Sequence, residues 1–340
     1  MRVLTRAFLA GLVTAVLLAP GVKVKADPVT IRADWSVIPG QFAPLIPTVP
    51  DYAPGLYRHY GKSYVVEPIK LKGGGATLTA LAVGETDLST LSPQALVLGI
   101  VNAKLDLRVI GEQISTEVPG YLQTYFWVEK DKIKTIDDLK GKVIGVSALG
   151  SNVDSAAQMV LGKHGLVAAR DYQIIEISFP SQFPALEAGK IDAAVLVPPF
   201  NLRAQKDPSV KPIFSIGDAF GPVETLMWIA KAEFVAKNRA ALVDFLEDNI
   251  RMRRWMFDPK TRPDAIKQLA DTSKIPAEQY AEWVYSKNDY YYDPNAMVDV
   301  ARLQRNVDDM KTAGIVPADI KVAPYVDLSL AKEAAARAAN

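Results

Sequence analysis

One short unit occurs twice in this chain, and it constrains the fold more than any other feature. Residues 80–93 read ALAVGETDLSTLSP and residues 185–198 read ALEAGKIDAAVLVP, with the same residue at six positions. In each copy a helical turn reaches a glycine, Gly84 or Gly189, which is the residue that most often closes a helix. An aspartate then enters a strand that stops at a proline, which cannot donate to a sheet ladder. Two copies so far apart predict two lobes of similar build.

Around these copies the sequence alternates strands with helices. Residues 29–35 alternate apolar and polar side chains, and residues 142–147 and 172–177 show the same strand pattern. Strands separated by helical stretches are typical of parallel sheets with crossover helices. After about residue 233 the apolar residues recur at helical spacing, which predicts a mainly helical end. The expected fold class is α/β, with a mixed, mainly parallel sheet flanked by helices in each lobe.

The beginning of the chain predicts export. Arg2 and Arg6 precede an uncharged, mostly apolar run of 12 residues, and small residues at positions 24 and 26 suit a signal peptidase. We therefore expect residues 1–26 to be a signal peptide that is cleaved before Asp27. A membrane anchor is the alternative, but a bilayer core requires about 20 apolar residues. The chain has no cysteine, which excludes disulfides, thiolate metal sites and a lipid anchor, so the periplasm is the expected location.

Length and charge limit the expected partners. Without residues 1–26 the chain has 314 residues, enough for two domains, each with its own core. It then carries 35 basic and 38 acidic residues, a net charge of −3. This balance gives no reason to expect a nucleic acid or an acidic membrane as partner. We expect a monomer with neither cofactor nor metal.

The patterns that mark catalytic sites are missing. The chain has two histidines, His59 and His164, and contains neither an HExxH nor a Gly-x-Ser-x-Gly pattern. The run Gly73-Gly74-Gly75 lacks the Lys-Ser/Thr that follows in a phosphate-binding loop. A flexible loop that opens a helix at Ala76 is the interpretation we favour. No catalytic residue is assigned, and an enzyme is not expected.

Two other clusters receive structural interpretations. Arg251, Arg253 and Arg254 form a basic run on a predicted helix, which is typical of a solvated face, with a docking patch for a permease as the alternative. The run Tyr290–Tyr292 is expected to pack, partly buried, near a turn.

The paired Ala-Leu-x-x-Gly-x-x-Asp motifs do not stand alone. Residues 135–147 read TIDDLKGKVIGVS, residues 310–317 read MKTAGIVP, and Tyr325-Val-Asp327 follows. In this order the segments resemble the bacterial periplasmic solute-binding proteins of the nitrate/sulfonate/taurine and thiamine-precursor group. That resemblance covers nearly the whole mature chain. It implies the type II periplasmic-binding-protein fold, a small-molecule ligand held between two lobes, and the permease of an ABC transporter as partner.

The resemblance also implies where the chain crosses between the lobes. Residues 27–116 and 225–330 would form the first lobe, which is discontinuous, and residues 117–224 the second. Residues 331–340 are expected to be a frayed, helical C-terminal tail. A cleft of this kind closes by hinge motion, and contacts from both lobes to the ligand stabilise the closed form.

Ligand contacts are expected just beyond the carboxyl ends of the strands, as in open α/β sheets. This rule predicts four loops, at residues 34–40, 90–94, 147–154 and 197–201. Aromatic side chains at positions 35, 121 and 228 could stack on a ligand, although core packing is the commoner role. The candidate ligand-binding residues are Asp34, Trp35, Thr90, Ser92, Ser147, Gly150, Ser151, Asn152, Pro198 and Trp228.

Residues 147–154 have the clearest physical basis for binding. They leave a strand, pass Gly150 and open a helix, where free N–H groups with Ser151 and Asn152 could bind an anion. Helix capping is the alternative role of these side chains and is compatible with binding. In the expected mechanism, Ser92, Ser147 and Ser151 hold the ligand and favour closure, without chemistry.

The sequence is compatible with several classes of ligand. None of the four loops contains Arg or Lys. A small organic anion, such as a sulfonate or carboxylate, is the first expectation. A neutral solute, resembling a thiamine pyrimidine or carrying an aromatic group, is the alternative. A ligand-sensing domain for a membrane receptor would show the same sequence features.

Overall fold

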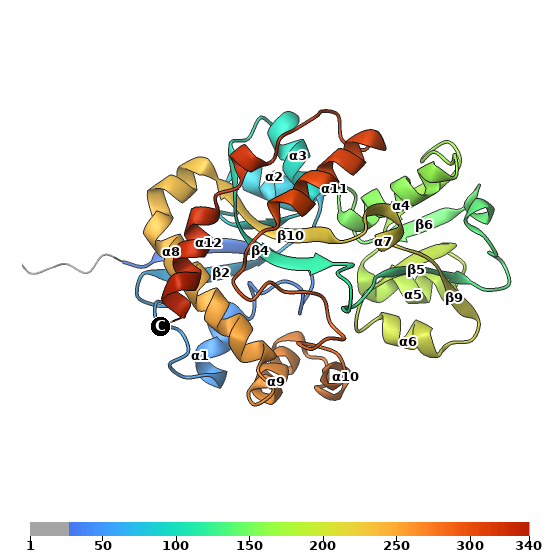
Figure 1. Cartoon of the computed structure of the whole chain (residues 1–340). Helices are drawn as coiled ribbons and strands as arrows, with labels where there is room; N and C mark the ends of the chain where they lie inside the picture. Colours follow the sequence, from blue (N-terminus) through green and yellow to red (C-terminus); the bar gives the residue numbers. More distant parts are fainter. Residues whose placement is uncertain (1–26, 340) are drawn as a thin grey trace, which may run out of the picture.

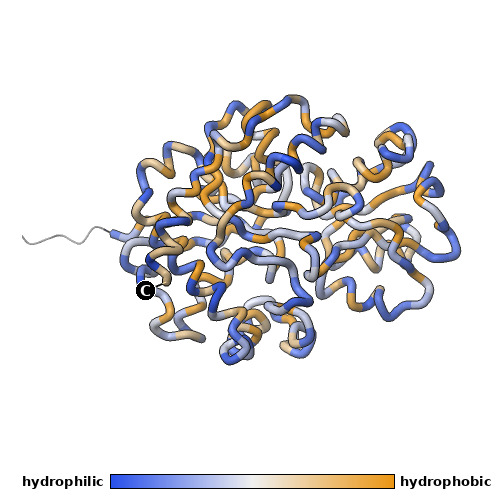
Figure 2. The backbone as a smooth tube through the Cα atoms, viewed as in Figure 1, coloured by the Kyte–Doolittle hydropathy of each residue, from blue (hydrophilic) through white to orange (hydrophobic). Residues whose placement is uncertain are grey.

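The computed structural model describes residues 27–339 as two lobes joined by crossing segments (Figure 1). The predicted signal peptide, residues 1–26, lies outside the described residues. Within the described chain, no helix is long and apolar enough to cross a membrane. Apolar residues concentrate inside both lobes and hydrophilic residues follow the outer loops (Figure 2). The buried apolar residues form one cluster in the first lobe, one in the second, and one that includes residues of both lobes.

The first lobe is built on five strands. The parallel pair β1–β2 joins the antiparallel set β3-β10-β4 through a parallel bridge between Ala33 and Leu88. The strands span Val29–Trp35 (β1), Tyr64–Lys70 (β2), Ser89–Leu91 (β3), Leu107–Thr116 (β4) and Val223–Lys231 (β10).

The second lobe contains one five-stranded sheet in the order β7-β6-β8-β5-β9. Its strands span Tyr125–Glu129 (β5), Val143–Val146 (β6), Gln173–Glu176 (β7), Ala193–Leu196 (β8) and Val210–Ser215 (β9). Strand β6 pairs in parallel with β7 and β8, whereas β5 pairs antiparallel with β8 and β9. The sheets are mixed, with more antiparallel pairing than the sequence predicts, because β5 and β10, the first strands after the two crossings, run against both of their neighbours.

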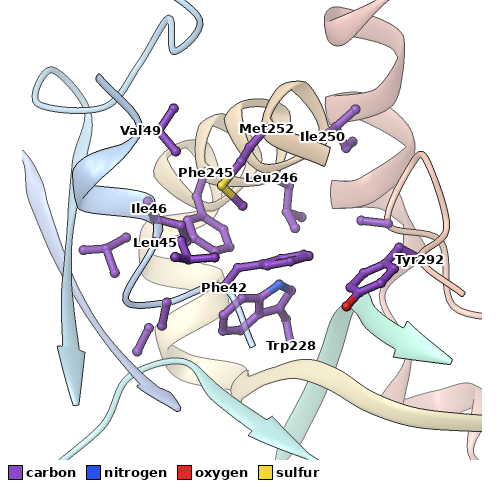
Figure 3. Packing of buried hydrophobic residues seen from close by; sticks show 14 of the residues in the cluster. Phe42, Leu45, Ile46, Val49, Trp228, Phe245, Leu246, Ile250, Met252 and Tyr292 are labelled. Atoms are coloured by element: carbon purple, nitrogen blue, oxygen red, sulfur yellow. The ribbon is translucent and has the colours of Figure 1, made fainter. Parts of the chain in front are cut away.

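Twelve α-helices in the described chain cover these sheets, and the long α8 dominates the helical end. They span Val49–Tyr52 (α1), Gly75–Val83 (α2), Pro93–Val101 (α3), Asn152–Lys163 (α4), Phe179–Glu187 (α5), Asn201–Lys206 (α6), Gly217–Phe220 (α7), Ala232–Phe257 (α8), Arg262–Ser273 (α9), Glu278–Ala281 (α10), Val300–Thr312 (α11) and Leu328–Ala338 (α12). The core of the first lobe packs on α8, where Phe245 meets Trp228 edge to face at 5.5 Å between ring centroids (Figure 3).

The repeated unit has the structure that its sequence predicts. Gly84 closes α2 with φ +78°, and Gly189 follows α5 with φ +66°. Each aspartate binds the backbone of the neighbouring strand. The carboxylate of Asp87 accepts the N–H of Arg32 at 3.0 Å in β1, and that of Asp192 accepts the N–H of Val143 at 2.9 Å in β6. The aspartate in each copy thus joins the entry of its strand to the adjacent strand.

The C-terminal segment is not a frayed tail. Residues 328–338 form α12, which packs on α8 and buries Leu330, Ala331 and Ala334 completely. Its Glu333 pairs with Arg239 of α8 at 2.7 Å. The alanines form one small, apolar stripe that allows close approach to α8, and this is the reason for the Ala-rich composition.

Candidate functional site

A cavity of about 130 Å³ lies between the two lobes. Every one of the four predicted loops contributes to its wall. The wall consists of Ser36, Val37, Ile38, Pro39, Gly40, Gln41, Lys72, Gly73, Gly74, Thr90, Leu91, Ser92, Ala95, Ile114, Thr116, Thr124, Ser147, Ala148, Ser151, Asn152, Val153, Phe179, Val197, Pro198, Ile216, Thr225, Leu226, Trp283 and Tyr290. Most of these side chains are apolar or hydroxylated, and no carboxylate is among them.

Six of the ten candidate residues lie in this wall. They are Thr90, Ser92, Ser147, Ser151, Asn152 and Pro198. The structure places the other four elsewhere. Trp228 is fully buried in the core of the first lobe, and Trp35 lies beside Lys70, whose ammonium is 4.9 Å from the ring centroid. Asp34 and Gly150 lie behind the wall and support it.

Asp34 acts on the cleft through Thr90. Its buried carboxylate accepts the backbone N–H of Thr90 at 3.1 Å and the hydroxyl at 2.7 Å. Gln41 donates to the same hydroxyl and, through its carbonyl, accepts the N–H of Ser36. Burial raises the pKa of Asp34 to about 6, because a charged carboxylate is desolvated there. This network fixes the loops that follow β1 and β3.

Most of the predicted hydroxyl contacts are already used inside the protein. The hydroxyl of Ser92 donates to the carbonyl of Gly150 and caps α3, and that of Ser151 donates to the carbonyl of Ala148 and caps α4. Thr90 donates to Asp34. The hydroxyl of Ser147, by contrast, forms no hydrogen bond with the described part of the chain. Of the three serines in the expected mechanism, Ser147 is the one whose hydroxyl is free to contact a ligand.

The two lobes touch across the cleft. The N–H of Gly75 donates to the carbonyl of Leu149 at 3.3 Å, and the amide of Asn152 donates to the carbonyl of Thr225 at 3.0 Å. Gly74 makes the closest approach, since a Cβ at this position would lie 2.3 Å from the Leu149 carbonyl oxygen. The triple glycine is therefore an interlobe contact as well as the start of α2.

Lys72 is the one charged side chain in the wall, and the expectations from sequence do not include it. Lys72 follows β2, a strand that the sequence analysis does not predict. It lies beyond the carboxyl end of that strand, just as the four predicted loops lie beyond the carboxyl ends of their strands. Recognising residues 64–70 as a strand would have located it. Phe179 and Tyr290 also line the cavity, but they come from segments that carry no local binding signal.

A buried carboxylate joins the two crossing segments. Glu117 accepts the N–H of Thr124 at 2.9 Å and the N–H of Gly217 at 3.1 Å. Burial raises its pKa to about 7. Because Thr124 lines the cavity, this contact fixes the wall of the cleft at the hinge.

A group with metal-ligating side chains lies away from the cleft. His59, from the loop before β2, meets Asp244 and Glu247 of α8, and Glu247 is buried. The carboxylates already pair with arginines: Glu247 with Arg251 at 3.0 Å and Asp244 with Arg337 at 2.9 Å. The arrangement is that of an ion-pair network between α8 and its neighbours.

A family model described as NMT1/THI5 like matches residues 65–256, which is more than half of the chain. The chain belongs to this NMT1/THI5-like family. A relative in Bacillus subtilis (strain 168), named "Putative binding protein YtlA", is 22% identical over 266 residues, which cover 77% of this chain and 78% of that protein.

Solved structures of the same fold include binding proteins and an enzyme. The alkanesulfonate-binding protein SsuA from Xanthomonas axonopodis pv. citri, bound to MOPS, has a TM-score of 0.68 at 19% identity and covers 89% of this chain and 100% of its own. The periplasmic nitrate-binding protein NrtA from Synechocystis PCC 6803 has a TM-score of 0.67 at 14% identity, covering 91% and 89%. The desulfurization enzyme DSZB has a TM-score of 0.61 at 17% identity, covering 91% and 99%. These likenesses confirm the predicted periplasmic-binding-protein fold for this family member.

Proposed function

We propose that the protein is the periplasmic solute-binding component of an ABC importer, and that it captures a small organic anion between its lobes without changing it. The observation that carries this proposal is the cavity wall, which draws on both lobes and contains one cation and no carboxylate. Binding there would favour closure, and the closed form would dock on a membrane permease.

The polar groups of the wall suit an anion. Lys72 lies at the cavity, and the first turn of α4 supplies the N–H groups of Asn152 and Val153, which have no partner within the helix. The hydroxyl of Ser147 is a further donor. Because the rest of the wall is largely apolar, a hydrocarbon body would fill it while its anionic group meets these donors.

The relatives support the same class. SsuA is described as a protein that binds alkanesulfonates and NrtA as one that binds nitrate, and both ligands are anions. A similar structure from Staphylococcus aureus is described as the ligand-binding component of an ABC-type import system, which supports a permease as the partner. The expected signal peptide supports the periplasm.

A neutral or aromatic solute is the second candidate. Phe179, Trp283 and Tyr290 lie in the wall, and Lys72 is exposed to solvent, so an aromatic ring could be the principal anchor. The likeness to DSZB keeps an enzyme as an outcome to test. The wall offers neither histidine nor carboxylate as a general base, which favours binding over catalysis.

A thermal-shift screen of residues 27–340 would test the proposal. The panel would contain sulfonates, nitrate, aliphatic and aromatic carboxylates, and thiamine pyrimidines. A ligand at 100 times its Kd should stabilise the protein by about 2.7 kcal/mol, and we expect an organic anion to do so. Recovery of the ligand unchanged would support binding, whereas an altered compound would indicate an enzyme. Stabilisation by neutral compounds alone would favour the second candidate.

Replacing Lys72 by glutamine should weaken binding of the anion by roughly 10-fold at low salt, because one partly solvated charge is lost. Calorimetric titration would measure the change. Lys70→Gln is the matched control, because Lys70 lies on the same strand end but contacts Trp35 outside the cavity, and its affinity should stay within about twofold of the wild type. Equal affinities for both variants and the wild type would contradict a role for Lys72.

A further inference from the structure

One hydrogen-bond acceptor in the cavity wall has no partner. The side-chain oxygen of Asn152, Oδ1, is buried and accepts no hydrogen bond from the described residues. Asn152 is only 4% exposed, stands at the first position of α4 and lines the cavity. A buried acceptor that loses its hydrogen bond to water without a replacement destabilises the protein by about 1–3 kcal/mol. We therefore expect Asn152 Oδ1 to have a hydrogen-bond partner when the cleft is occupied.

The orientation of this amide is fixed by its other end. Its Nδ2 donates to the backbone carbonyl of Thr225 at 3.0 Å. A backbone carbonyl only accepts, so the nitrogen must face Thr225 and the oxygen must face away from it. Reversing the amide would place two acceptors against each other. The unpartnered atom is therefore an acceptor and not a donor.

The neighbouring hydroxyls do not supply the missing donor. Ser151 directs its proton to the carbonyl of Ala148, and Ser92 directs its proton to the carbonyl of Gly150. Thr90 donates to Asp34. These protons are held by buried or backbone acceptors. The hydroxyl of Ser147 is free, but it forms no hydrogen bond with Asn152 Oδ1 either. We therefore expect the N–H or O–H for Asn152 to come from whatever fills the cavity.

We infer that Asn152 is a specificity-determining residue that selects an organic anion carrying its own N–H or O–H donor. This inference rests on the proposed binding of an organic anion in the cleft. The ligand would direct its anionic group to the donors of the wall and a hydroxyl or amino group to Asn152 Oδ1. A site built around a polar group discriminates strongly against analogues that lack it, since the buried group is then left unpaired.

Matched pairs of anions test this inference. The pairs are propane-1-sulfonate with its 3-hydroxy and 3-amino derivatives, butanoate with 4-hydroxybutanoate, and benzenesulfonate with 4-hydroxybenzenesulfonate. Calorimetric titration of residues 27–340 would give each Kd. In at least one pair, we expect the donor-bearing member to bind 10-fold or more tightly than its partner.

Two variants separate recognition from closure. Asn152→Leu, which removes the acceptor, should reduce the preference within that pair to twofold or less. Ser155→Ala removes a different interlobe hydrogen bond, to Gln94, from a residue outside the cavity wall. This control should weaken both members equally and keep the preference.

The possible results distinguish a failure of the role inferred for Asn152 from a failure of the proposed anion binding. Anions that bind without any preference for a donor would overturn the role of Asn152 and leave the proposed function intact. A preference that survives in Asn152→Leu would also overturn it. If none of the anions binds to the wild type, the proposed function fails, and the inference with it. Should the leucine variant not fold, the absence of any preference in the wild type would still overturn the inference.

Discussion

Replacing Gly74 by alanine is expected to weaken ligand binding at least about 100-fold, because it prevents the lobes from meeting. The added Cβ would lie 2.3 Å from the carbonyl oxygen of Leu149 and 3.0 Å from the Cβ of Ala148, both in the second lobe. Backbone atoms cannot give way there without moving the lobe. Gly74 also has φ +55° and ψ −127°, a conformation that costs a residue with a side chain about 1–3 kcal/mol. If the closed form is destabilised by about 2.7 kcal/mol relative to the open form, the affinity for the ligand falls about 100-fold.

The adjacent glycine provides the matched control. A Cβ on Gly75 would meet no atom within 4 Å, and its φ is not positive. Gly75→Ala should therefore bind the ligand of the thermal-shift screen as the wild type does. Small-angle scattering with saturating ligand should show the compact form for the wild type and Gly75→Ala, but a more extended form for Gly74→Ala. Wild-type affinity in Gly74→Ala would show that this contact is not part of the ligand-bound state.

Residues that act locally could be predicted from the sequence. Val29–Trp35 alternates in polarity and forms β1 over the same residues, and the glycines and aspartates of the repeat have the backbone roles that their types suggest. The rule that ligands bind beyond the carboxyl ends of strands predicts four loops, and all four reach the cavity wall. These features depend on short stretches of chain, in which residue type and spacing carry the information.

Features that depend on distant partners could not be predicted in this way. Gly74 looks like a flexible loop residue until the second lobe is placed against it. Ser92 and Ser151 have the residue type of ligand contacts, but only the structure shows that their protons are directed to backbone carbonyls. Trp228 has the type of a stacking residue, and the packing of α8 on β10 buries it instead.

The arginine run on α8 is the clearest correction of this kind. A solvated face is expected, yet Arg253 is only 1% exposed. Its guanidinium pairs with the carboxylate of Glu112 in β4 at 2.7 Å and donates to the carbonyl of Asp293 at 2.9 Å. Nothing in residues 251–254 indicates that a buried glutamate lies opposite, since Glu112 is more than a hundred positions earlier in the chain.

Arg253→Met should lower the free energy of unfolding by about 3–5 kcal/mol at pH 8, the range observed when one partner of a buried ion pair is removed. Glu112 would then be buried either as a charge without its counter-ion or as a protonated acid, and at pH 8 both states cost free energy relative to the unfolded chain. Urea denaturation would measure the loss. Arg239→Ala is the control on the same helix, because its pair with Glu333 lies at the surface, and it should cost at most about 1 kcal/mol.

The loss in Arg253→Met should be smaller at pH 5 than at pH 8. In the wild type, burial raises the pKa of Glu112 to about 7, while the charge of Arg253 opposes that rise. The folded protein therefore holds this proton more tightly than the unfolded chain, and the associated stability is lost as the pH rises through about 7. Without Arg253 the pKa of Glu112 rises further, so at pH 5 the carboxyl is protonated and its burial costs little.

Adding Glu112→Gln to Arg253→Met should recover part of the lost unfolding free energy at pH 8 but little at pH 5. An equal loss at both pH values would show that Arg253 stabilises the fold through its packing and its bonds to carbonyl groups, and not through its charge.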